Sequence, residues 1–158
     1  MLSLKRLQGE LKQIKNEPFY SVEPDKHNAS IWNVLMFGPP DTIFEGAIFK
    51  CQFKFPPSYP NNPPEFKFIS PLLHPNIYTD GRVCISILHE GKDEYGYEDI
   101  SERWNPSQSV HSILMSIISL LPNPNFESPA NVDASILWKN NFNEYKKQVY
   151  KYVASCQN

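Results

Sequence analysis

Cys84 is the residue of this sequence best suited to nucleophilic or acyl-carrying chemistry. It lies within residues 81–88, which show no helical or alternating apolar periodicity, and a cysteine in a structured loop is a natural nucleophile. His74 and Asn76 lie ten and eight residues before it, on either side of Pro75. A histidine can activate a thiol, and an asparagine N–H can stabilise the oxyanion of an acyl transfer. The pattern predicts acyl chemistry at Cys84, with loop-stabilising hydrogen bonds as the alternative role for His74 and Asn76.

Strands are predicted on the N-terminal side of this loop. Alternation of apolar and polar residues is clearest over residues 48–55, where Cys51 shares the apolar face with three phenylalanines. We therefore expect Cys51 to be a buried, inert thiol. Further strands are expected over residues 20–23, 31–37 and 66–69. No helix is expected between them, which favours an antiparallel meander.

Helices are predicted before and after the strands. Residues 4–14 carry apolar side chains at helical spacing, and residues 107–121 carry a wider apolar stripe, with Ser107 as the expected N-cap. Ser128 is expected to cap a further helix with a proline at its first position, and the final helix spans about 141–154. The order of helix, strands, long loop and helices is an α+β architecture.

Length and composition indicate one globular domain over residues 1–158. A share of 41% apolar residues is enough for a core, and a net charge of −2 argues against a dedicated nucleic-acid binder. No apolar run approaches the roughly 20 residues of a membrane span, and the charged N-terminus does not read as a secretory signal. The three cysteines form no metal-like cluster, so we expect no metal and reduced thiols, as in the cytoplasm or nucleus. Cys156, near the C-terminus, is expected to be an exposed spectator.

Several motifs occur in the order and spacing of one protein family. They are residues 55–60 (Phe-Pro-Pro-Ser-Tyr-Pro), 74–77 (His-Pro-Asn-Ile), 81–84 (Gly-Arg-Val-Cys), 104–106 (Trp-Asn-Pro) and 128–131 (Ser-Pro-Ala-Asn). In these motifs the chain resembles the ubiquitin-conjugating enzymes over essentially all of its 158 residues. The resemblance implies their fold, a four-stranded antiparallel meander flanked by an N-terminal helix, a central buried helix and C-terminal helices.

The resemblance also implies the reaction. Cys84 would accept the C-terminal acyl group of ubiquitin from the ubiquitin-activating enzyme as a thioester, and would pass it to a lysine amine. His74 and Asn76 would belong to the catalytic site, and Asn76 would stabilise the oxyanion or order the loop that does so. ATP would be used by the activating enzyme, so no cofactor is expected on this chain.

A long acidic segment, residues 89–103, separates Cys84 from Trp104. It contains six carboxylates and two basic residues, and it is similar to the insertion of the G-type branch of the family. Such a segment would be a solvated loop, a lid, or a loop that attracts an acceptor lysine. Acceptor-side or lid residues expected on this basis are Ser128, His89, Asp93, Glu94 and Tyr78.

Ligase contacts, with a ligase of the RING type, are a further implication. The expected contact residues are Lys5, Arg6, Pro57, Asn61, Pro106 and Ser107. Residues 56–64 hold five prolines, so they form a stiff surface loop that is either a connector or a preformed contact. Asn61 stands where relatives often carry a large apolar residue, which removes apolar contact worth roughly 1–3 kcal/mol and leaves the choice of ligase open. Any recruitment to the endoplasmic reticulum surface would come through a partner.

Three other functions remain open at this stage. The chain could carry another ubiquitin-like modifier, although the acidic segment argues against this. It could be a non-catalytic ubiquitin-binding variant, although such variants lack the cysteine. A Cys–His hydrolase would release its acyl group to water and would form no stable thioester.

Overall fold

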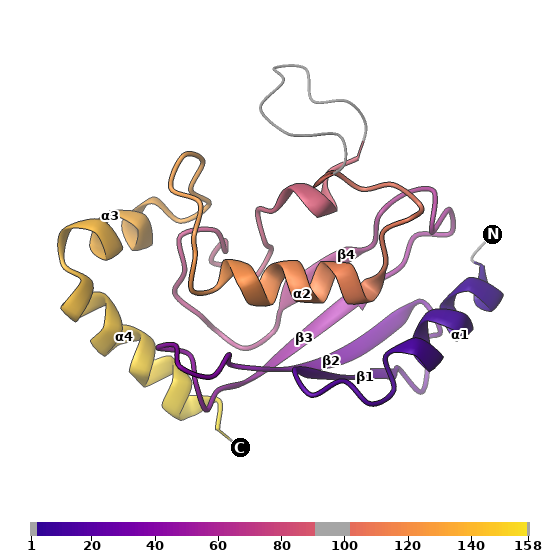
Figure 1. Ribbon diagram of the computed structural model, residues 1–158, viewed down its shortest axis with the longest axis horizontal. Coiled ribbons are helices and arrows are strands. Elements are labelled where there is room, and N and C mark those ends of the chain that lie inside the picture. The colour runs from indigo at the N-terminus through magenta and orange to yellow at the C-terminus, as the bar shows by residue number, and fades with distance from the viewer. Residues whose placement is uncertain (1–2, 91–101, 158) are drawn as a thin grey trace.

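The structure is a computed structural model that describes residues 3–90 and 102–157 (Figure 1). Asp93, Glu94 and most of the acidic segment therefore lie outside the described residues. The elements in chain order are α1 (Leu4–Gln13), β1 (Tyr20–Pro24), β2 (Ile31–Phe37), β3 (Ile48–Lys54), β4 (Glu65–Phe68), the 3₁₀ helix η1 (Ser86–Leu88), α2 (Val110–Leu120), α3 (Val132–Asn140) and α4 (Phe142–Ser155). This order confirms the α+β fold class.

The four strands form one antiparallel sheet in the order β1-β2-β3-β4, as the meander interpretation predicted. In β3 the side chains of Phe49, Cys51 and Phe53 are buried, whereas Lys50 and Lys54 on the opposite face are exposed. The prediction that Cys51 is a packing thiol is confirmed. Burial also raises the pKa of this thiol well above its ordinary value.

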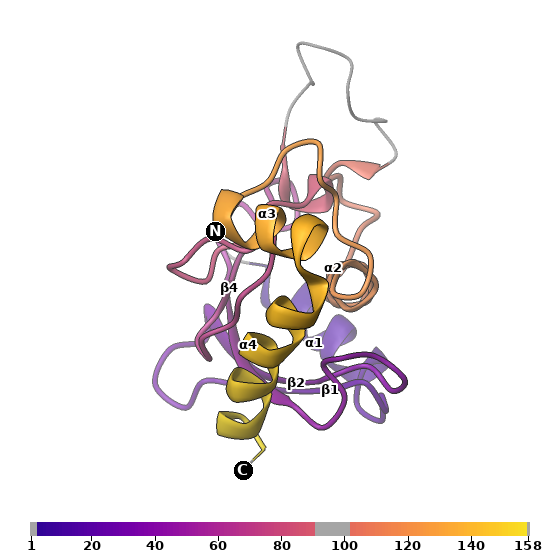
Figure 2. The same cartoon turned by 90° about the vertical axis from the view of Figure 1, so that its left-hand side faces the viewer.

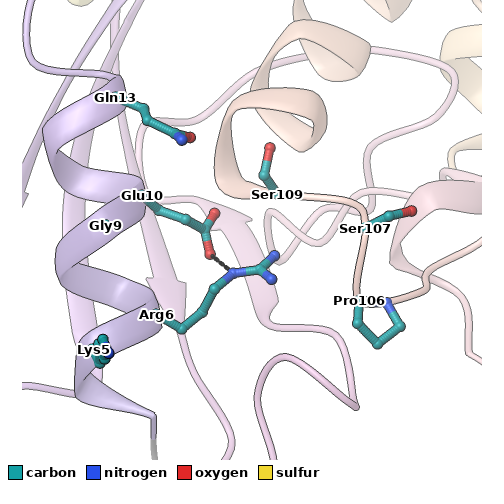
Figure 3. A pocket seen from close by; sticks show the side chains of 8 residues that line it. All are labelled: Lys5, Arg6, Gly9, Glu10, Gln13, Pro106, Ser107 and Ser109. Atoms are coloured by element: carbon teal, nitrogen blue, oxygen red, sulfur yellow. Dashed lines mark hydrogen bonds and ion pairs between the residues drawn. The ribbon is translucent and has the colours of Figure 1, made fainter.

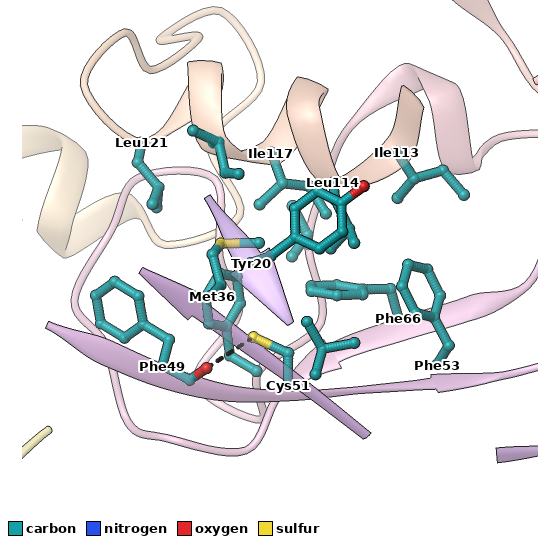
Figure 4. Packing of buried hydrophobic residues seen from close by; sticks show 14 of the residues in the cluster. Tyr20, Met36, Phe49, Cys51, Phe53, Phe66, Ile113, Leu114, Ile117 and Leu121 are labelled. Atoms are coloured by element: carbon teal, nitrogen blue, oxygen red, sulfur yellow. Dashed lines mark hydrogen bonds between the residues drawn. The ribbon is translucent and has the colours of Figure 1, made fainter. Parts of the chain in front are cut away.

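The core lies between the sheet and α2. This helix crosses one face of the sheet, and its buried residues Ile113, Leu114 and Ile117 face the phenylalanines of the strands (Figure 4). At one end of the sheet lies α1, and at the other end α3 and α4 follow one another (Figures 1 and 2). The long segment between β4 and α2 lies along the edge of the sheet at β4, where Arg82 bridges Lys67. This segment carries the candidate site.

The predicted N-cap of the central helix is wrong. Ser109, and not Ser107, caps α2, because Ser109 and Ser112 form a reciprocal capping box in which each side chain accepts the other's backbone N–H. Ser107 belongs to the preceding turn, where its backbone N–H and hydroxyl both bond the Asn105 side chain. Both Ser107 and Ser109 could cap this helix by residue type. Only Ser109 has a partner, Ser112, with which two backbone N–H groups at the helix start are satisfied.

The predicted start of α3 is also wrong. Asn131 is its N-cap and accepts from the backbone N–H of Ala134, so Ser128 lies in an exposed bend before the helix. The backbone N–H groups of Ala130 and Asn131 donate to the carbonyl of Pro75, at 2.8 and 3.0 Å. Because these two N–H groups bond Pro75, they are not available to a cap at Ser128, and the helix begins after Asn131.

Cys156 is buried, which corrects its expected exposure. It retains 7% of its surface, and its backbone carbonyl accepts a 2.6 Å hydrogen bond from the backbone N–H of Ile48 at the start of β3. The end of α4 therefore closes onto the sheet.

Candidate active site

A short hairpin over residues 76–84 carries Cys84. The backbone N–H of Cys84 donates to the carbonyl of Asn76 at 2.8 Å, Ile77 bridges Val83, and the N–H of Tyr78 donates to Arg82 at 2.9 Å. The side chains of Ile77 and Val83 are buried in the core, whereas Cys84 is only partly buried. The alternation of an extended chain therefore turns Cys84 toward the outer side of the hairpin.

Gly81 makes the turn of this hairpin possible. Its φ is +96°, and a Cβ at this position would lie 2.0 Å from the carbonyl oxygen of Phe68. The backbone N–H of Phe68 in turn donates to Gly81 at 2.8 Å. The hairpin thus rests directly on the end of β4, with no space for a side chain between them.

We expect Gly81→Ala to lower stability and to change the reactivity of the Cys84 thiol. The left-handed backbone alone costs an L-residue roughly 1–2 kcal/mol, and the overlap with Phe68 adds to that cost. The measurement is urea denaturation together with the rate at which the Cys84 thiol of the variant is alkylated. Gly9→Ala is a matched control, because a Cβ at Gly9 meets no atom within 4 Å. Wild-type reactivity of Cys84 in Gly81→Ala would contradict the placement of Cys84 by this turn.

His74 is completely buried beneath the hairpin. Its Nδ1 accepts the backbone N–H of Asn76 at 3.0 Å, and its Nε2 lies 3.0 Å from the carbonyl of Leu121 at the end of α2. Burial lowers the pKa of His74 to about 4, against the weaker opposite effect of its carbonyl partners. Nε2 must therefore carry the single proton of a neutral ring. Both nitrogens are engaged, which favours the loop-stabilising alternative for His74 over a base that activates Cys84: the ring joins the hairpin to α2.

The NMR signals of the His74 ring should not titrate between pH 5 and 8. Because its folded pKa lies below its unfolded value near 6.5, its contribution to stability is complete above about 6.5 and is lost as pH falls toward 4. Urea denaturation across this range should show that slope, and His74→Gln should reduce it. A ring that titrates near pH 6.5 in the folded protein would contradict this account.

Asn76 is 1% exposed, and both ends of its side-chain amide bond the backbone of one distant residue. Nδ2 donates to the backbone carbonyl of Asn125, and Oδ1 accepts the Asn125 N–H, both at 2.8 Å. This pairing favours the loop-ordering alternative for Asn76. Sequence reasoning did not single out Asn125. The available signal was that Asn125 follows Pro124 in a loop interrupted by prolines. The backbone N–H and carbonyl groups of such a loop need hydrogen-bond partners from elsewhere in the protein.

The remaining acceptor-side residues occupy different surroundings. Ser128 is exposed on the segment that the Pro75 carbonyl holds beside the hairpin. Tyr78 is 39% exposed, and the Arg82 guanidinium lies 4.8 Å from its ring centre. His89 follows η1, and its backbone carbonyl accepts the N–H of Trp104 at 2.9 Å. Ser128 and Tyr78 therefore come from segments that the histidine–proline–asparagine turn joins, while His89 lies at the base of the acidic segment.

The predicted partner residues come from three segments that meet. The indole N–H of Trp104 donates to the carbonyl of Pro60 at 2.9 Å, which joins the proline-rich loop to residues 104–107. Within these two segments Pro57, Asn61, Pro106 and Ser107 are all exposed.

Glu10 joins α1 to both loops. Its buried carboxylate accepts from Arg6 Nε at 2.9 Å, from the Tyr59 hydroxyl at 2.5 Å and from the Val110 N–H at 2.7 Å. Arg6 Nη2 also donates to the carbonyl of Gln108. The side chain of Arg6 is thus turned into the protein, while Lys5 stays exposed. Beside this network lies a pocket of about 440 Å³ (Figure 3), lined by Lys5, Arg6, Gly9, Glu10, Gln13, Pro106, Ser107 and Ser109.

Among residues 3–90 and 102–157, no group of three or more His, Cys, Asp or Glu side chains could hold a metal ion. None of the helices in these ranges combines the length and apolarity required to cross a bilayer.

Comparison with known proteins identifies the family of this chain. The sequence profile described as ubiquitin-conjugating enzyme matches residues 6–153. The chain is 46% identical to the probable ubiquitin-conjugating enzyme E2 7 of Caenorhabditis elegans, with 99% of this chain and 96% of that protein covered. It is 48% identical to the ubiquitin-conjugating enzymes E2 7 and E2 13 of Arabidopsis thaliana, with 96% of this chain and 93% of each covered. The chain belongs to the ubiquitin-conjugating enzyme family, the thioester-forming acyltransferases of ubiquitin transfer.

Proposed function

We propose that Cys84 is the residue on which this enzyme carries ubiquitin. The observation that supports this is the contrast among its three cysteines: Cys51 and Cys156 are buried, and Cys84 alone is partly exposed. It also lies at the outer side of a hairpin that Gly81 and His74 hold in place. A thiol that exchanges with a thioester on another protein must be reachable, and the other two are not.

The first step is thioester exchange. The Cys84 thiolate attacks the carbonyl carbon of the thioester between ubiquitin and the activating enzyme, and the thiolate of that enzyme leaves. ATP is consumed by the activating enzyme in forming its own thioester, so this chain needs no cofactor.

The second step is aminolysis. A neutral lysine amine attacks the Cys84 thioester, a tetrahedral oxyanion forms, and the Cys84 thiolate leaves as the amine gives up its proton. An ammonium is not a nucleophile, so surroundings that disfavour its charge promote this step. Asn76 acts here by holding the loop at Asn125, with Ser128 and Tyr78 on the acceptor side.

We place the chain in the G-type branch of the family, with residues 89–103 as its acidic insertion. The support is compositional: a segment with six carboxylates begins five residues after Cys84. In this proposal His89, Asp93 and Glu94 favour the approach of an acceptor lysine. In this proposal the enzyme acts in the cytoplasm or nucleus, where its thiols stay reduced. The branch assignment adds that a partner recruits it to the endoplasmic reticulum in protein degradation.

The proposed ligase surface combines Lys5, Arg6, the loop with Pro57 and Asn61, and the turn with Pro106 and Ser107. The hydrogen bonds from Trp104 to Pro60 and from Arg6 to Gln108 support a single preformed surface. Such a surface loses little conformational entropy on binding, which suits a transient RING ligase.

A loading assay tests the assignment of Cys84. Purified protein, ubiquitin, activating enzyme and ATP are mixed and separated without reductant. We expect a band one ubiquitin heavier that disappears with thiol reductant, is absent in Cys84→Ala, and becomes a reductant-resistant oxyester in Cys84→Ser. Cys51→Ala is the matched control and should load normally if it folds.

Loading of Cys84→Ala would overturn the assignment. Loading only with another ubiquitin-like modifier would move the enzyme to that alternative, and acyl release to water without any thioester would indicate the hydrolase. Binding of ubiquitin without loading would indicate the non-catalytic variant.

A further inference from the structure

Arg82 presents a pre-oriented hydrogen-bonding edge on the outer side of the hairpin. Its Nε donates to the Asp80 carboxylate at 2.7 Å, and its guanidinium carbon lies 4.8 Å from the centre of the Tyr78 ring. The backbone N–H of Arg82 donates to the same carboxylate at 3.1 Å. Two neighbours therefore fix the plane of the guanidinium, although the side chain remains 66% exposed.

Within the described residues, the terminal nitrogens of this guanidinium form no hydrogen bond. The contacts of Arg82 within the described residues are its backbone bonds, the Nε bond and the stacking on Tyr78. This guanidinium is held through its Nε and by stacking on the Tyr78 ring. Its two terminal nitrogens therefore offer a pair of N–H donors, a fork whose geometry matches a carboxylate. Since less side-chain freedom remains to be lost, a carboxylate can bind there more readily than at an unrestrained arginine.

The register of the hairpin sets this fork beside the reacting thiol. Ile77 and Val83 point into the core, so Tyr78, Arg82 and Cys84 share the outer side. Arg82 and Cys84 are two residues apart on one extended strand, which separates their Cα atoms by about 7 Å. An acceptor chain whose lysine reaches Cys84 must therefore pass within side-chain reach of Arg82.

We propose that Arg82 is a specificity-determining residue that binds an acidic side chain close to the acceptor lysine. The inference rests on the proposed role of Cys84. The Tyr78–Arg82 stack and the Asp80 bond hold the fork, and an aspartate or glutamate of the acceptor occupies it while the lysine amine meets the thioester. Neutral acceptors, which lack that carboxylate, still react but are held less well.

The test is single-turnover discharge of the preloaded enzyme to paired peptides. Each pair has one lysine, flanked by glutamates in one peptide and by glutamines in the other. We expect the wild type to discharge about two- to fivefold faster to the glutamate peptide at subsaturating concentration, the range of an exposed ion pair. Arg82→Ala should reduce this ratio to about one. Arg82→Glu should instead favour a peptide whose lysine is flanked by trimethyllysine, a cation that cannot react.

Lys26→Ala is the control, since it removes an exposed cation from another part of the fold and should keep the ratio. Equal wild-type rates for the two peptides, or an unchanged ratio in Arg82→Ala, would overturn the proposal. Loading of Cys84 is measured separately for every variant. A wild type that does not load refutes the proposed function, whereas variants that load normally but do not discriminate differently refute only the role of Arg82.

Discussion

Asn76→Ala is expected to slow transfer of ubiquitin from Cys84 to lysine by about 10²–10³-fold, the effect typical of losing one oxyanion donor. The pairing of the Asn76 amide with Asn125 favours an indirect origin of this loss. Both ends of the Asn76 amide bond the backbone of Asn125, so alanine would leave that N–H and carbonyl without their partner. Each orphaned backbone group costs about 1–3 kcal/mol when it stays away from water, and the loop will move to avoid that cost.

Two measurements separate loop ordering from direct donation to the oxyanion. Loop ordering predicts faster amide hydrogen exchange at Asn125 and lower folding stability in Asn76→Ala, together with the slower discharge. Direct donation predicts slower discharge with both properties unchanged. Asn123→Ala is a matched control, because its amide bonds only the exposed end of α2, at Ser119, and it should discharge at the wild-type rate. A wild-type rate in Asn76→Ala would contradict both routes.

The sheet could be predicted from the sequence because its signal is local. The alternation around Cys51 follows from the geometry of a strand with one buried face, and the register of Cys51 with Val34 and Phe68 then completes a buried layer. Cys84 could be singled out as a candidate for a related reason, since it lies outside any apolar pattern. In both cases the residue type and its immediate neighbours carry the information.

The surroundings of His74 and Asn76 could not be predicted, because their partners are distant in sequence. The ring of His74 meets Leu121, 47 residues away, and the amide of Asn76 meets Asn125, 49 residues away. Both partners are backbone groups, which leave no mark on residue type. The sequence showed three polar residues together, but only the fold shows that two of them support the third.

The incorrect caps have a similar origin. Ser107, Ser109 and Ser112 are equivalent by residue type, and the choice among them depends on a reciprocal pair of hydrogen bonds. Ser128 failed as a cap because Pro75 captures the N–H groups that follow it. Cys156 was expected to be exposed from its position in the chain, but the end of α4 pairs with the start of β3.

Glu10→Ala is expected to lower the free energy of unfolding by about 3–5 kcal/mol, the cost of breaking a buried ion pair by removing one partner. The carboxylate is 6% exposed and satisfies three donors: the Arg6 guanidinium, the Tyr59 hydroxyl and the Val110 N–H at the start of α2. Its negative charge also lies at the N-terminus of that helix, where the helix dipole favours it. Alanine removes all of these contacts at once.

The double variant Glu10→Gln with Arg6→Met tests whether the charge pair or the packing matters. Removing both charges should recover part of the stability lost in Glu10→Gln alone, because no uncompensated charge then stays buried. Urea denaturation measures each step, and Glu23→Ala, at an exposed position of β1, should change stability by no more than about 0.5 kcal/mol.

The functional consequence follows from what Glu10 connects. Because α1, the proline-rich loop and the start of α2 meet at this carboxylate, Glu10→Gln should weaken the stimulation of ubiquitin discharge by a ligase more than it slows unassisted discharge to free lysine. Cys84 lies on a separate hairpin, so loading below the unfolding temperature should remain close to normal. Equal losses in the assisted and unassisted reactions would show that Glu10 stabilises the whole domain and does not specifically organise the ligase surface.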